Sequence, residues 1–311
     1  MKMINVGIYF IVIIFLGLVT FAYCIRPGVK TNYQSEWLKK NKTSSFQFEG
    51  ANIHYYKKGI GQNIILLHGG GTWLYSYRNN IDKLAENYCV YAIDLPGHGY
   101  SQIPKGYKYN FSDIMEIIDS FYEYEGIKKA TIVGNSWGGG WAIYFAERRK
   151  DKVEKLILID SSGLKNSNEY DKSIWSFLNY PLIGEIIIHF ITEKSIRKSF
   201  EEELFYDKKK INEKITKEVY KPLTFSHNLS AQIQYQRNLK WKDTGYLLNQ
   251  INVPTLIIWG KEDKYLPVEM AYEYKKIIPK SELVIFDKAG HLVHEELSDE
   301  VNDLILDFMG K

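Results

Sequence analysis

Short apolar runs bounded by turn-forming residues recur along most of the chain. Several of them are apolar at every position, which is typical of central strands in a parallel sheet that is covered on both faces. We therefore predict six strands, over Ile64–Leu67, Cys89–Ile93, Ala130–Val133, Leu156–Ile159, Thr255–Trp259 and Leu283–Phe286.

The segments between these runs carry apolar residues at helical spacing. Between residues 111 and 124, the apolar positions follow one another at steps of three and four. They are Phe111, Ile114, Met115, Ile118 and Phe121. Because strands and helices alternate along the chain, we predict an α/β domain with a doubly wound, mostly parallel sheet.

The alternation stops between residues 163 and 245. This stretch is rich in Lys, Glu, Tyr and Phe, and pieces such as Ile183–Ile191 and Val219–Phe225 have helical patterns. It is too long for a structureless loop in a compact domain. We predict a helical cap over the carboxyl edge of the sheet, where open α/β folds bind ligands. The predicted organisation is an amino-terminal segment (1–30), a connector (31–45), a first core part (46–162), the cap (163–245) and a second core part (246–311).

Residues 3–25 carry no charge and are mostly Ile, Val, Phe and Leu. A helix of this length reaches about 34 Å, which is enough for a hydrocarbon core of about 30 Å. We therefore predict an uncleaved transmembrane helix that anchors the protein in a membrane as a single pass. A cleaved signal, which would make the protein an exported one, is the alternative, although Thr20-Phe21-Ala22 is a poor cleavage site. Basic residues flank the segment on both sides, so the sequence does not indicate which side the folded domain faces.

Charge and cysteine content narrow the classes of protein. The 40 basic and 37 acidic residues give a net charge of +3, and the excess comes from Lys2, Arg26 and Lys30. The remainder of the chain is neutral overall, so nucleic acid is not an expected partner. Two cysteines, Cys24 and Cys89, are too few for a disulfide framework or a Cys-based zinc site.

A candidate nucleophile lies between the predicted strand at 130–133 and the helix that follows. Gly134-Asn135-Ser136-Trp137-Gly138 has the G-x-S-x-G pattern in the strand, turn and helix context of a nucleophile elbow. The glycines allow a sharp turn in which larger side chains would clash with the neighbouring strand and helix. A plain glycine-rich turn is the alternative for this pattern taken alone.

A serine hydroxyl needs a general base, and the base needs an acid that orients it. Asp263 follows the predicted strand at 255–259, and His291 follows the strand at 283–286. Both therefore emerge at the same sheet edge as Ser136. We predict a Ser136, His291 and Asp263 triad.

The loop after the first predicted strand supplies a candidate oxyanion hole. In His68-Gly69-Gly70-Gly71, unhindered glycines let the backbone approach a reacting carbonyl closely. We assign the two donors to the amides of Gly70 and Trp137, and we expect His68 to brace the loop. His291-Leu292-Val293-His294-Glu295 matches neither ordering of the zinc-protease motifs, so no metal site is expected.

These motifs together resemble the α/β-hydrolase fold family, in the branch that holds esterases, epoxide hydrolases, proline iminopeptidases and carbon–carbon bond hydrolases. The resemblance rests on the glycine loop at 68–71, the loop at 94–101, the elbow, and the turns at Asp263 and His291, and it spans about residues 46–309. It implies a structural role for the 94–101 loop. A serine at 136 excludes the epoxide hydrolase and haloalkane dehalogenase chemistries, which the resemblance ties to an aspartate there. Asp160 stands where some members carry the acid and is a reserve for Asp263, with Glu262 weaker.

The sequence thus predicts a membrane-anchored serine hydrolase with a small-molecule substrate and no cofactor. The expected reaction is cleavage of an ester or amide of a largely apolar substrate. Carbon–carbon bond hydrolysis of a diketone-like substrate, proline iminopeptidase action and a ligand-binding module with a vestigial triad are the alternatives. Aromatic residues of the cap are candidate pocket lining, namely Trp175, Phe177, Tyr180 and Phe225.

Overall fold

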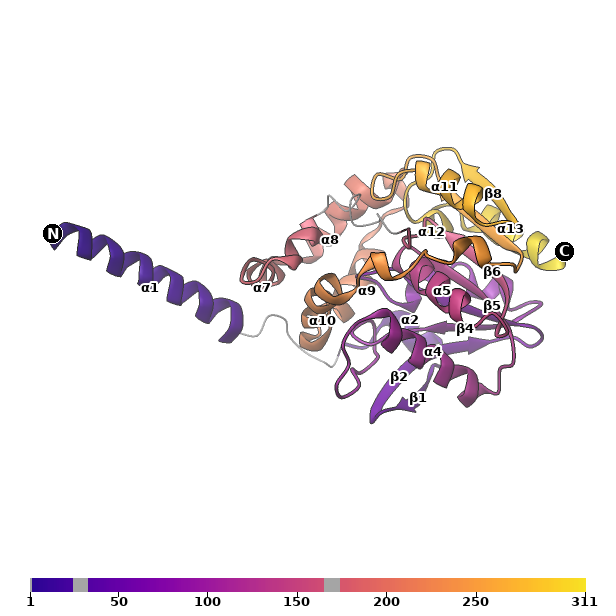
Figure 1. The fold of residues 1–311 in the computed structure, drawn as a ribbon, viewed down its shortest axis with the longest axis horizontal. Coiled ribbons are helices and arrows are strands. Elements are labelled where there is room, and N and C mark those ends of the chain that lie inside the picture. Colours follow the sequence, from indigo (N-terminus) through magenta and orange to yellow (C-terminus); the bar gives the residue numbers. More distant parts are fainter. Residues whose placement is uncertain (1, 25–32, 165–173) are drawn as a thin grey trace.

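The fold is built on an eight-stranded sheet within the described residues, 2–24, 33–164 and 174–311, of a computed structural model (Figure 1). The strand order is β1-β2-β4-β3-β5-β6-β7-β8. Strand β2 pairs antiparallel with both β1 and β4, and the other neighbours are parallel. The strands are β1 (Ser44–Phe48), β2 (Ala51–Lys58), β3 (Asn63–Leu67), β4 (Cys89–Ile93), β5 (Ala130–Asn135), β6 (Val153–Ile159), β7 (Thr255–Gly260) and β8 (Ser281–Phe286).

All six predicted strands are confirmed, and together they form the parallel part of the sheet, β3 to β8. Sequence patterns missed the hairpin of β1 and β2. Strand β1 lies at the sheet edge and buries only Phe46, so it shows no continuous apolar run. The turn between the two strands uses Glu49 and Gly50, both with positive φ.

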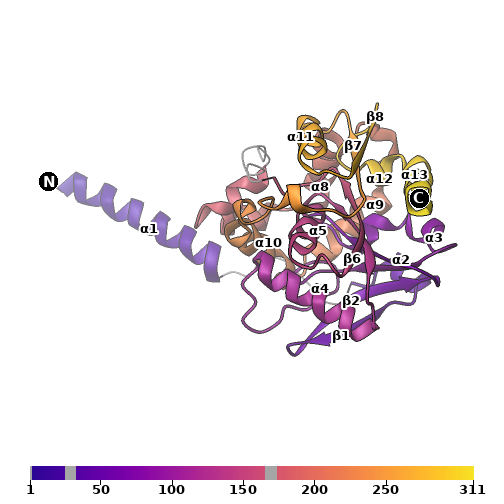
Figure 2. The same cartoon turned by 45° about the vertical axis from the view of Figure 1, so that its right-hand side comes forward.

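Helices cover both faces of the sheet, as a doubly wound fold requires. Successive residues of β3 point to opposite faces, so Ile65 and Leu67 join one core cluster while Ile64 and Leu66 join the other. On the first face lie α4 (Phe111–Glu125), α5 (Trp137–Arg148) and α11 (Glu269–Ile277). On the second lie α3 (Ile81–Leu84) and α13 (Ser298–Gly310), and the short α12 (Val293–Glu296) precedes α13 (Figure 2).

Every described element between β6 and β7 is helical, so this region forms a cap beside the sheet (Figures 1 and 2). A Cβ added to Gly245 would lie 2.6 Å from the carbonyl oxygen of Gly163, so the chain enters and leaves this region at nearly one place. The cap elements are η2 (Ile174–Asn179), α7 (Ile183–Ile187), η3 (Ile188–Phe190), α8 (Glu193–Ser199), the π-turn η4 (Phe200–Leu204), η5 (Lys208–Lys210), α9 (Glu213–Leu223), α10 (Ser226–Asn238) and η6 (Trp241–Asp243), with η7 (Leu248–Gln250) leading to β7.

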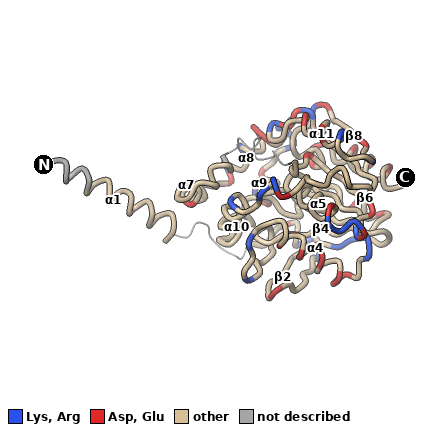
Figure 3. The backbone as a smooth tube through the Cα atoms, in the orientation of Figure 1, with Lys and Arg blue, Asp and Glu red and all other residues tan. Residues whose placement is uncertain are grey.

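The amino-terminal helix α1 (Lys2–Cys24) extends away from the sheet, and its last turn contacts the cap (Figure 1). The rings of Phe21 and His189 lie 4.2 Å apart, and the Leu182 amide donates to the Tyr23 hydroxyl at 3.3 Å. Ala22 is buried at this contact. Charged residues are interspersed along the folded domain but are absent from the part of α1 that Figure 3 colours as described.

The predicted membrane anchor over residues 3–25 is wrong. Among the helices that the structure describes, none combines the length and apolarity needed to cross a bilayer. The last turn of α1 is moreover engaged with the cap. The single-pass membrane localisation and the membrane partner that the sequence predicted are corrected accordingly.

Candidate active site

Ser136 lies at the sharp turn between β5 and α5. Its φ of 53° is positive, a conformation that non-glycine residues rarely adopt and that marks strain at functional sites. The turn is held because the Ser136 amide donates to Ile159 O at 3.1 Å and the Ser162 amide donates to Ser136 O at 3.0 Å. The serine is 5% exposed and lines a pocket.

The glycines of the elbow are required by close backbone approach. A Cβ on Gly134 would lie 2.3 Å from Gly138 O, and one on Gly138 would lie 2.1 Å from Leu67 O. Real Cβ atoms do not approach backbone that closely, so only glycine fits at these two positions. The elbow therefore packs α5 directly against β3 and β5 and fixes where Ser136 emerges.

His291 and Asp263 form a direct pair at the same sheet edge. His291 Nδ1 donates to Asp263 Oδ2 at 2.7 Å, and both residues are buried. The other carboxylate oxygen accepts from the amides of Tyr265 and Leu266, at 2.7 and 2.9 Å, so the acid is fixed in place. This arrangement leaves His291 Nε2 as the nitrogen able to accept a proton.

Ser136 and His291 line one pocket, and no direct hydrogen bond joins them among the described residues. Such contacts in ligand-free enzymes often tighten only when the substrate binds. The structure thus brings the three predicted triad residues to one place, from three different strand ends.

Asp160, the reserve acid, lies behind this pair rather than against the histidine. Its carboxylate accepts from the Gly260 amide at 2.8 Å and from the Val293 amide at 3.5 Å. Burial, and next the neighbouring Asp263 charge, raise the pKa of Asp160 well above its usual range. Asp160 therefore joins the end of β7 to the loop after His291 through backbone amides.

Glu262, the weaker reserve, accepts from the Ala289 amide at 3.1 Å. It braces the turn before His291. His291 Nδ1 is thus paired with Asp263, and the other two candidate acids both contact backbone amides.

The glycine loop after β3 lies against the elbow. A Cβ on Gly70 would lie 2.6 Å from the Trp137 indole, and one on Gly69 would lie 3.2 Å from the Ser136 Cβ. Trp137 is the first residue of α5, so its amide has no acceptor within the helix and lies at the positive end of the helix dipole. The amides of Gly70 and Trp137 thus come from two backbone segments that meet beside Ser136.

His68 braces this loop, as the sequence predicts. Its Nδ1 donates to Gly69 O at 2.7 Å, and its Nε2 accepts from the Leu95 amide at 3.2 Å. The side chain is fully buried, and burial lowers the pKa of its imidazole. Neutral His68 therefore links the glycine loop to the segment after β4.

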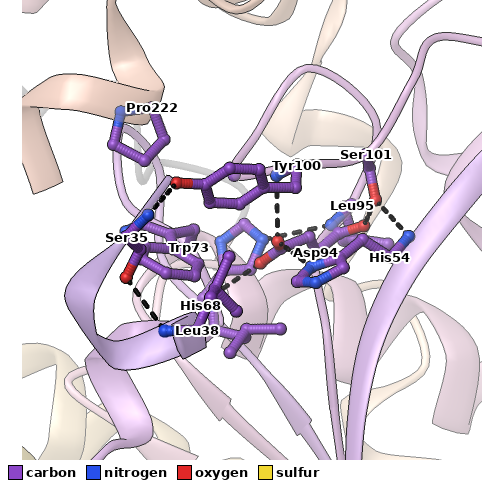
Figure 4. A network of polar contacts seen from close by, with 12 residues as sticks. Ser35, Leu38, His54, His68, Trp73, Asp94, Leu95, Tyr100, Ser101 and Pro222 are labelled. Carbon is purple, nitrogen blue, oxygen red and sulfur yellow. Dashed lines mark hydrogen bonds and ion pairs between the residues drawn. The ribbon is translucent and has the colours of Figure 1, made fainter. Parts of the chain in front are cut away.

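The segment after β4 is organised by Asp94 (Figure 4). Its carboxylate accepts from the Leu74 amide at 2.7 Å, from the Tyr100 amide at 3.1 Å and from His54 Nδ1 at 2.7 Å. The Tyr100 hydroxyl in turn accepts from the Ser35 amide at 3.1 Å, which ties the chain before β1 to this loop. Asp94 thus has a structural role, consistent with the resemblance.

The pocket has a volume of about 80 Å³ and lies between the sheet edge and the cap. Among the predicted cap aromatics, Trp175 lines it together with Leu178. The two stand three residues apart in a 3-10 helix, where that spacing places side chains on one face.

The other three predicted aromatics are not among the described residues that line the pocket. Phe177 and Tyr180 occupy another face of the same segment and are about half exposed, at 48% and 58%. Phe225 is buried against the Tyr100 ring at 5.6 Å. Aromatic composition alone did not distinguish the pocket face from the cap surface and the interface with the core.

Glu296 is a residue that sequence reasoning missed. Its buried carboxylate accepts from the amides of Gly290, Tyr206 and Asp207, at 2.9, 3.2 and 2.6 Å. It therefore ties the loop that carries His291 to the cap segment between η4 and η5. No motif marks it, because its partners are backbone amides that are remote in sequence.

We expect Glu296→Gln to lower the melting temperature by several degrees and to reduce kcat more than it changes KM. Each hydrogen bond to a charged carboxylate contributes at most about 1.5–3 kcal/mol to the free energy of unfolding. In the glutamine variant, the side-chain NH₂ group would point at backbone N–H donors and could not accept from them, so stability falls. Thermal unfolding and steady-state kinetics measure both effects. Glu300→Gln, an exposed change on α13, is the control, and equal behaviour of the two variants would contradict the positioning role.

His294 lies outside the pocket in a separate buried cluster. Its Nε2 contacts the Ser76 hydroxyl at 2.8 Å, and that hydroxyl also donates to Glu295 at 2.7 Å. Burial, followed by the charges of Arg78 and His291, lowers the pKa of His294 to about 3. The side chain thus stays neutral and structural, packing α12 onto η1 (Leu74–Tyr77).

Comparison with known proteins agrees with this geometry. An uncharacterized hydrolase of Bacillus subtilis (strain 168), YugF, is 27% identical over 267 residues, covering 85% of this chain and 96% of that protein. A 2-hydroxy-6-oxononadienedioate/2-hydroxy-6-oxononatrienedioate hydrolase of Paraburkholderia phymatum is 26% identical over 279 residues, covering 83% and 91%. A solved structure of a meta-cleavage product hydrolase from Pseudomonas fluorescens IP01 has a TM-score of 0.73 at 25% identity, covering 86% and 97%.

The relatives share the hydrolase assignment in their names, so the chain is a hydrolase enzyme. The alpha/beta hydrolase fold family matches residues 62–296, which run from the start of β3 to the end of α12 and include the cap but not β1, β2 or α13. The chain therefore belongs to the alpha/beta hydrolase fold family.

Proposed function

We propose that the protein hydrolyses an ester or amide of a small to medium, largely apolar substrate through a covalent acyl-enzyme. The observation that carries this proposal is the 2.7 Å pair of His291 and Asp263 at a pocket that also contains the strained Ser136. A serine, an oriented histidine and two convergent amides are the parts that acyl transfer needs.

In the first half-reaction, Ser136 Oγ attacks the substrate carbonyl carbon while His291 Nε2 takes the hydroxyl proton. The carbonyl oxygen becomes an oxyanion, and the amides of Gly70 and Trp137 donate hydrogen bonds to it. When this intermediate collapses, the bond to the leaving group breaks and His291 returns the proton to the departing alcohol or amine. Ser136 is then acylated.

In the second half-reaction, a water molecule attacks the acyl carbon and His291 again takes the proton. Collapse of the second intermediate releases the carboxylic acid and returns the proton to Ser136 Oγ. Throughout, Asp263 accepts the Nδ1 hydrogen of His291, which keeps Nε2 facing the reaction and stabilises the imidazolium. Apart from the substrate and water, every group used in these steps belongs to this chain.

Carbon–carbon bond hydrolysis of a diketone-like substrate is a second candidate. It is supported by the names of relatives at 25–28% identity, which include 2-hydroxy-6-oxo-dienoic acid hydrolases and a meta-cleavage product hydrolase. The same Ser136, His291 and amide donors serve either reaction, so the substrate distinguishes the two.

A substrate panel on the purified chain tests the proposal. We expect aryl esters of short and medium fatty acids to be hydrolysed with kcat/KM at least about 10⁴ M⁻¹s⁻¹, within the ordinary range for enzymes. The comparison substrate is a 2-hydroxy-6-oxo-dienoate, followed by loss of its absorbance. Faster turnover of the dienoate than of every ester would overturn the proposal in favour of the second candidate.

A further inference from the structure

The cap side of the pocket is largely apolar. Leu178, Ile196, Phe200 and Val219 line it, together with Trp175. Gln232 and Gln236 add two uncharged polar groups from α10. Across the pocket lie Ser136, His291 and the glycine loop. Such a composition suits an apolar acyl group but provides no counter-charge for an anion.

Glu203 is the one acidic side chain among the described residues that line this pocket, and neither Lys nor Arg occurs among them. Its carboxylate accepts from the Ser199 hydroxyl at 2.9 Å, and Ser199 also lines the pocket. The two preceding glutamates, in contrast, each form an ion pair with a basic side chain. Glu201 contacts Arg197 at 2.8 Å, and Glu202 contacts Lys198 at 3.7 Å.

No ion pair joins Glu203 to a cation within the described part of the chain. A hydroxyl donor supports the ionised carboxylate without neutralising it. Within the described residues, the pocket wall thus carries a negative charge that no cation compensates. This charge lies next to apolar surface, where the effective dielectric is lower than in water and charge interactions are stronger.

The backbone places this charge near the reacting groups. Glu203 belongs to the π-turn η4, in which the Phe205 amide donates to Phe200 O at 2.9 Å. π-turns of this kind are frequent at functional sites. The next carbonyl, Leu204 O, accepts from the Leu292 amide at 3.3 Å, and Leu292 follows His291. A backbone hydrogen bond therefore joins the turn that carries Glu203 to the loop that carries His291.

We propose that Glu203 makes the site selective for charge, so that it accepts substrates with an uncharged acyl group and rejects those whose acyl group bears a carboxylate. This proposal rests on the proposed acyl-transfer function and narrows its substrate class. A carboxylate in the pocket would face Glu203 and find no Lys or Arg among the described lining residues. Like-charge juxtaposition at such a site lowers reactivity about 10–100-fold.

A pair of isosteric esters measures this selectivity. The 5-methylhexanoate and hemiglutarate esters of 4-nitrophenol differ in a terminal isopropyl group against a terminal carboxylate. The quantity compared is the ratio of their kcat/KM values, corrected by their ratio with imidazole in solution. We expect the wild-type ratio to favour the uncharged ester at least about tenfold, and Glu203→Gln to shrink it at least about tenfold.

Glu202→Gln is the matched control, because this neighbouring acid is mostly exposed, is paired with Lys198 and does not line the pocket. It should leave the ratio at the wild-type value. Equal turnover of the two esters by wild type, or an unchanged ratio in Glu203→Gln, would overturn the proposal.

Labelling separates this proposal from the proposed function. If neither ester is hydrolysed but an uncharged fluorophosphonate still labels Ser136, the proposed ester hydrolysis is wrong. Charge selectivity can then still be measured, as the ratio of labelling rates for an uncharged and a carboxylate-bearing fluorophosphonate. The same ordering and the same effect of Glu203→Gln are expected. A protein that neither hydrolyses nor labels would overturn both proposals.

Discussion

Ser136→Ala is expected to lower kcat by at least about 10⁴-fold and to abolish fluorophosphonate labelling, because the other groups of the site cannot supply the attacking oxygen. The variant should fold like the wild type. Alanine keeps the Cβ at φ 53°, and the elbow is held by backbone bonds to Ile159 and Ser162 that do not involve the hydroxyl. Steady-state kinetics, labelling and circular dichroism measure the three quantities.

Ser161→Ala is the control for this variant. Ser161 is a buried serine just after β6, and its hydroxyl donates to Ser162 O at 2.6 Å. Its loss removes a serine hydroxyl close to the elbow but should leave labelling in place. Activity of Ser136→Ala within tenfold of the wild type would show that the nucleophile lies elsewhere.

Asp263→Asn is expected to reduce kcat by about 10²–10⁴-fold while KM changes little. The amide would present a nitrogen to His291 Nδ1 or force the other tautomer, so Nε2 would no longer be free to take the serine proton. The bonds from Tyr265 and Leu266 to the other oxygen remain possible for an asparagine, so the loop should keep its shape. Single-turnover kinetics of acylation isolate the affected step.

Asp160→Asn makes the same chemical change one strand away and serves as the comparison. Burial and the charge of Asp263 raise the pKa of Asp160, which favours its neutral form, so the substitution changes the charge of the site less than it would at an exposed aspartate. Its effect on kcat should stay within about tenfold, because Asp160 contacts backbone amides and not the histidine. A larger loss from Asp160→Asn than from Asp263→Asn would mean that the acid is misassigned.

These two tests depend on features that were predictable to different degrees. The strand ends that carry Ser136, Asp263 and His291 could be located from the sequence, because buried parallel strands appear as continuous apolar runs and a following turn puts the next polar residue at the sheet edge. The sequence predicted Asp263 as the acid and kept Asp160 in reserve, because both follow such strands. Only the 2.7 Å contact with His291 separates them in the structure.

For the cap, the sequence predicted the type of secondary structure but not which side chains line the pocket. Its helical character and its place between β6 and β7 follow from the break in strand periodicity. The faces of its short helices do not, because a turn or two carries too little pattern to say which side meets the pocket. Trp175 was therefore anticipated at the pocket together with three aromatics that lie elsewhere, while Leu178 and Glu203 were missed.

In the amino-terminal segment, hydropathy predicted the secondary structure correctly but not the location of the helix. The absence of charge between residues 3 and 25 predicted a helix, and α1 is helical. It also predicted an anchor, which the described helices do not support. Composition shows that a segment is apolar enough for a membrane or for a protein contact. The contacts of Phe21 and Tyr23 with the cap depend on the position of the cap in the folded protein, which composition does not give.

By itself the sequence determined the strand pattern, the elbow and the identity of the candidate nucleophile and base, because these depend on local periodicity and on residues adjacent in the chain. Only the tertiary structure decided which acid meets His291, that Glu296 ties the histidine loop to the cap, and that Glu203 faces the pocket without a described cation. Each of these involves groups far apart in sequence, often a side chain on a backbone amide, and such pairs become neighbours only when the sheet edge and the cap pack together.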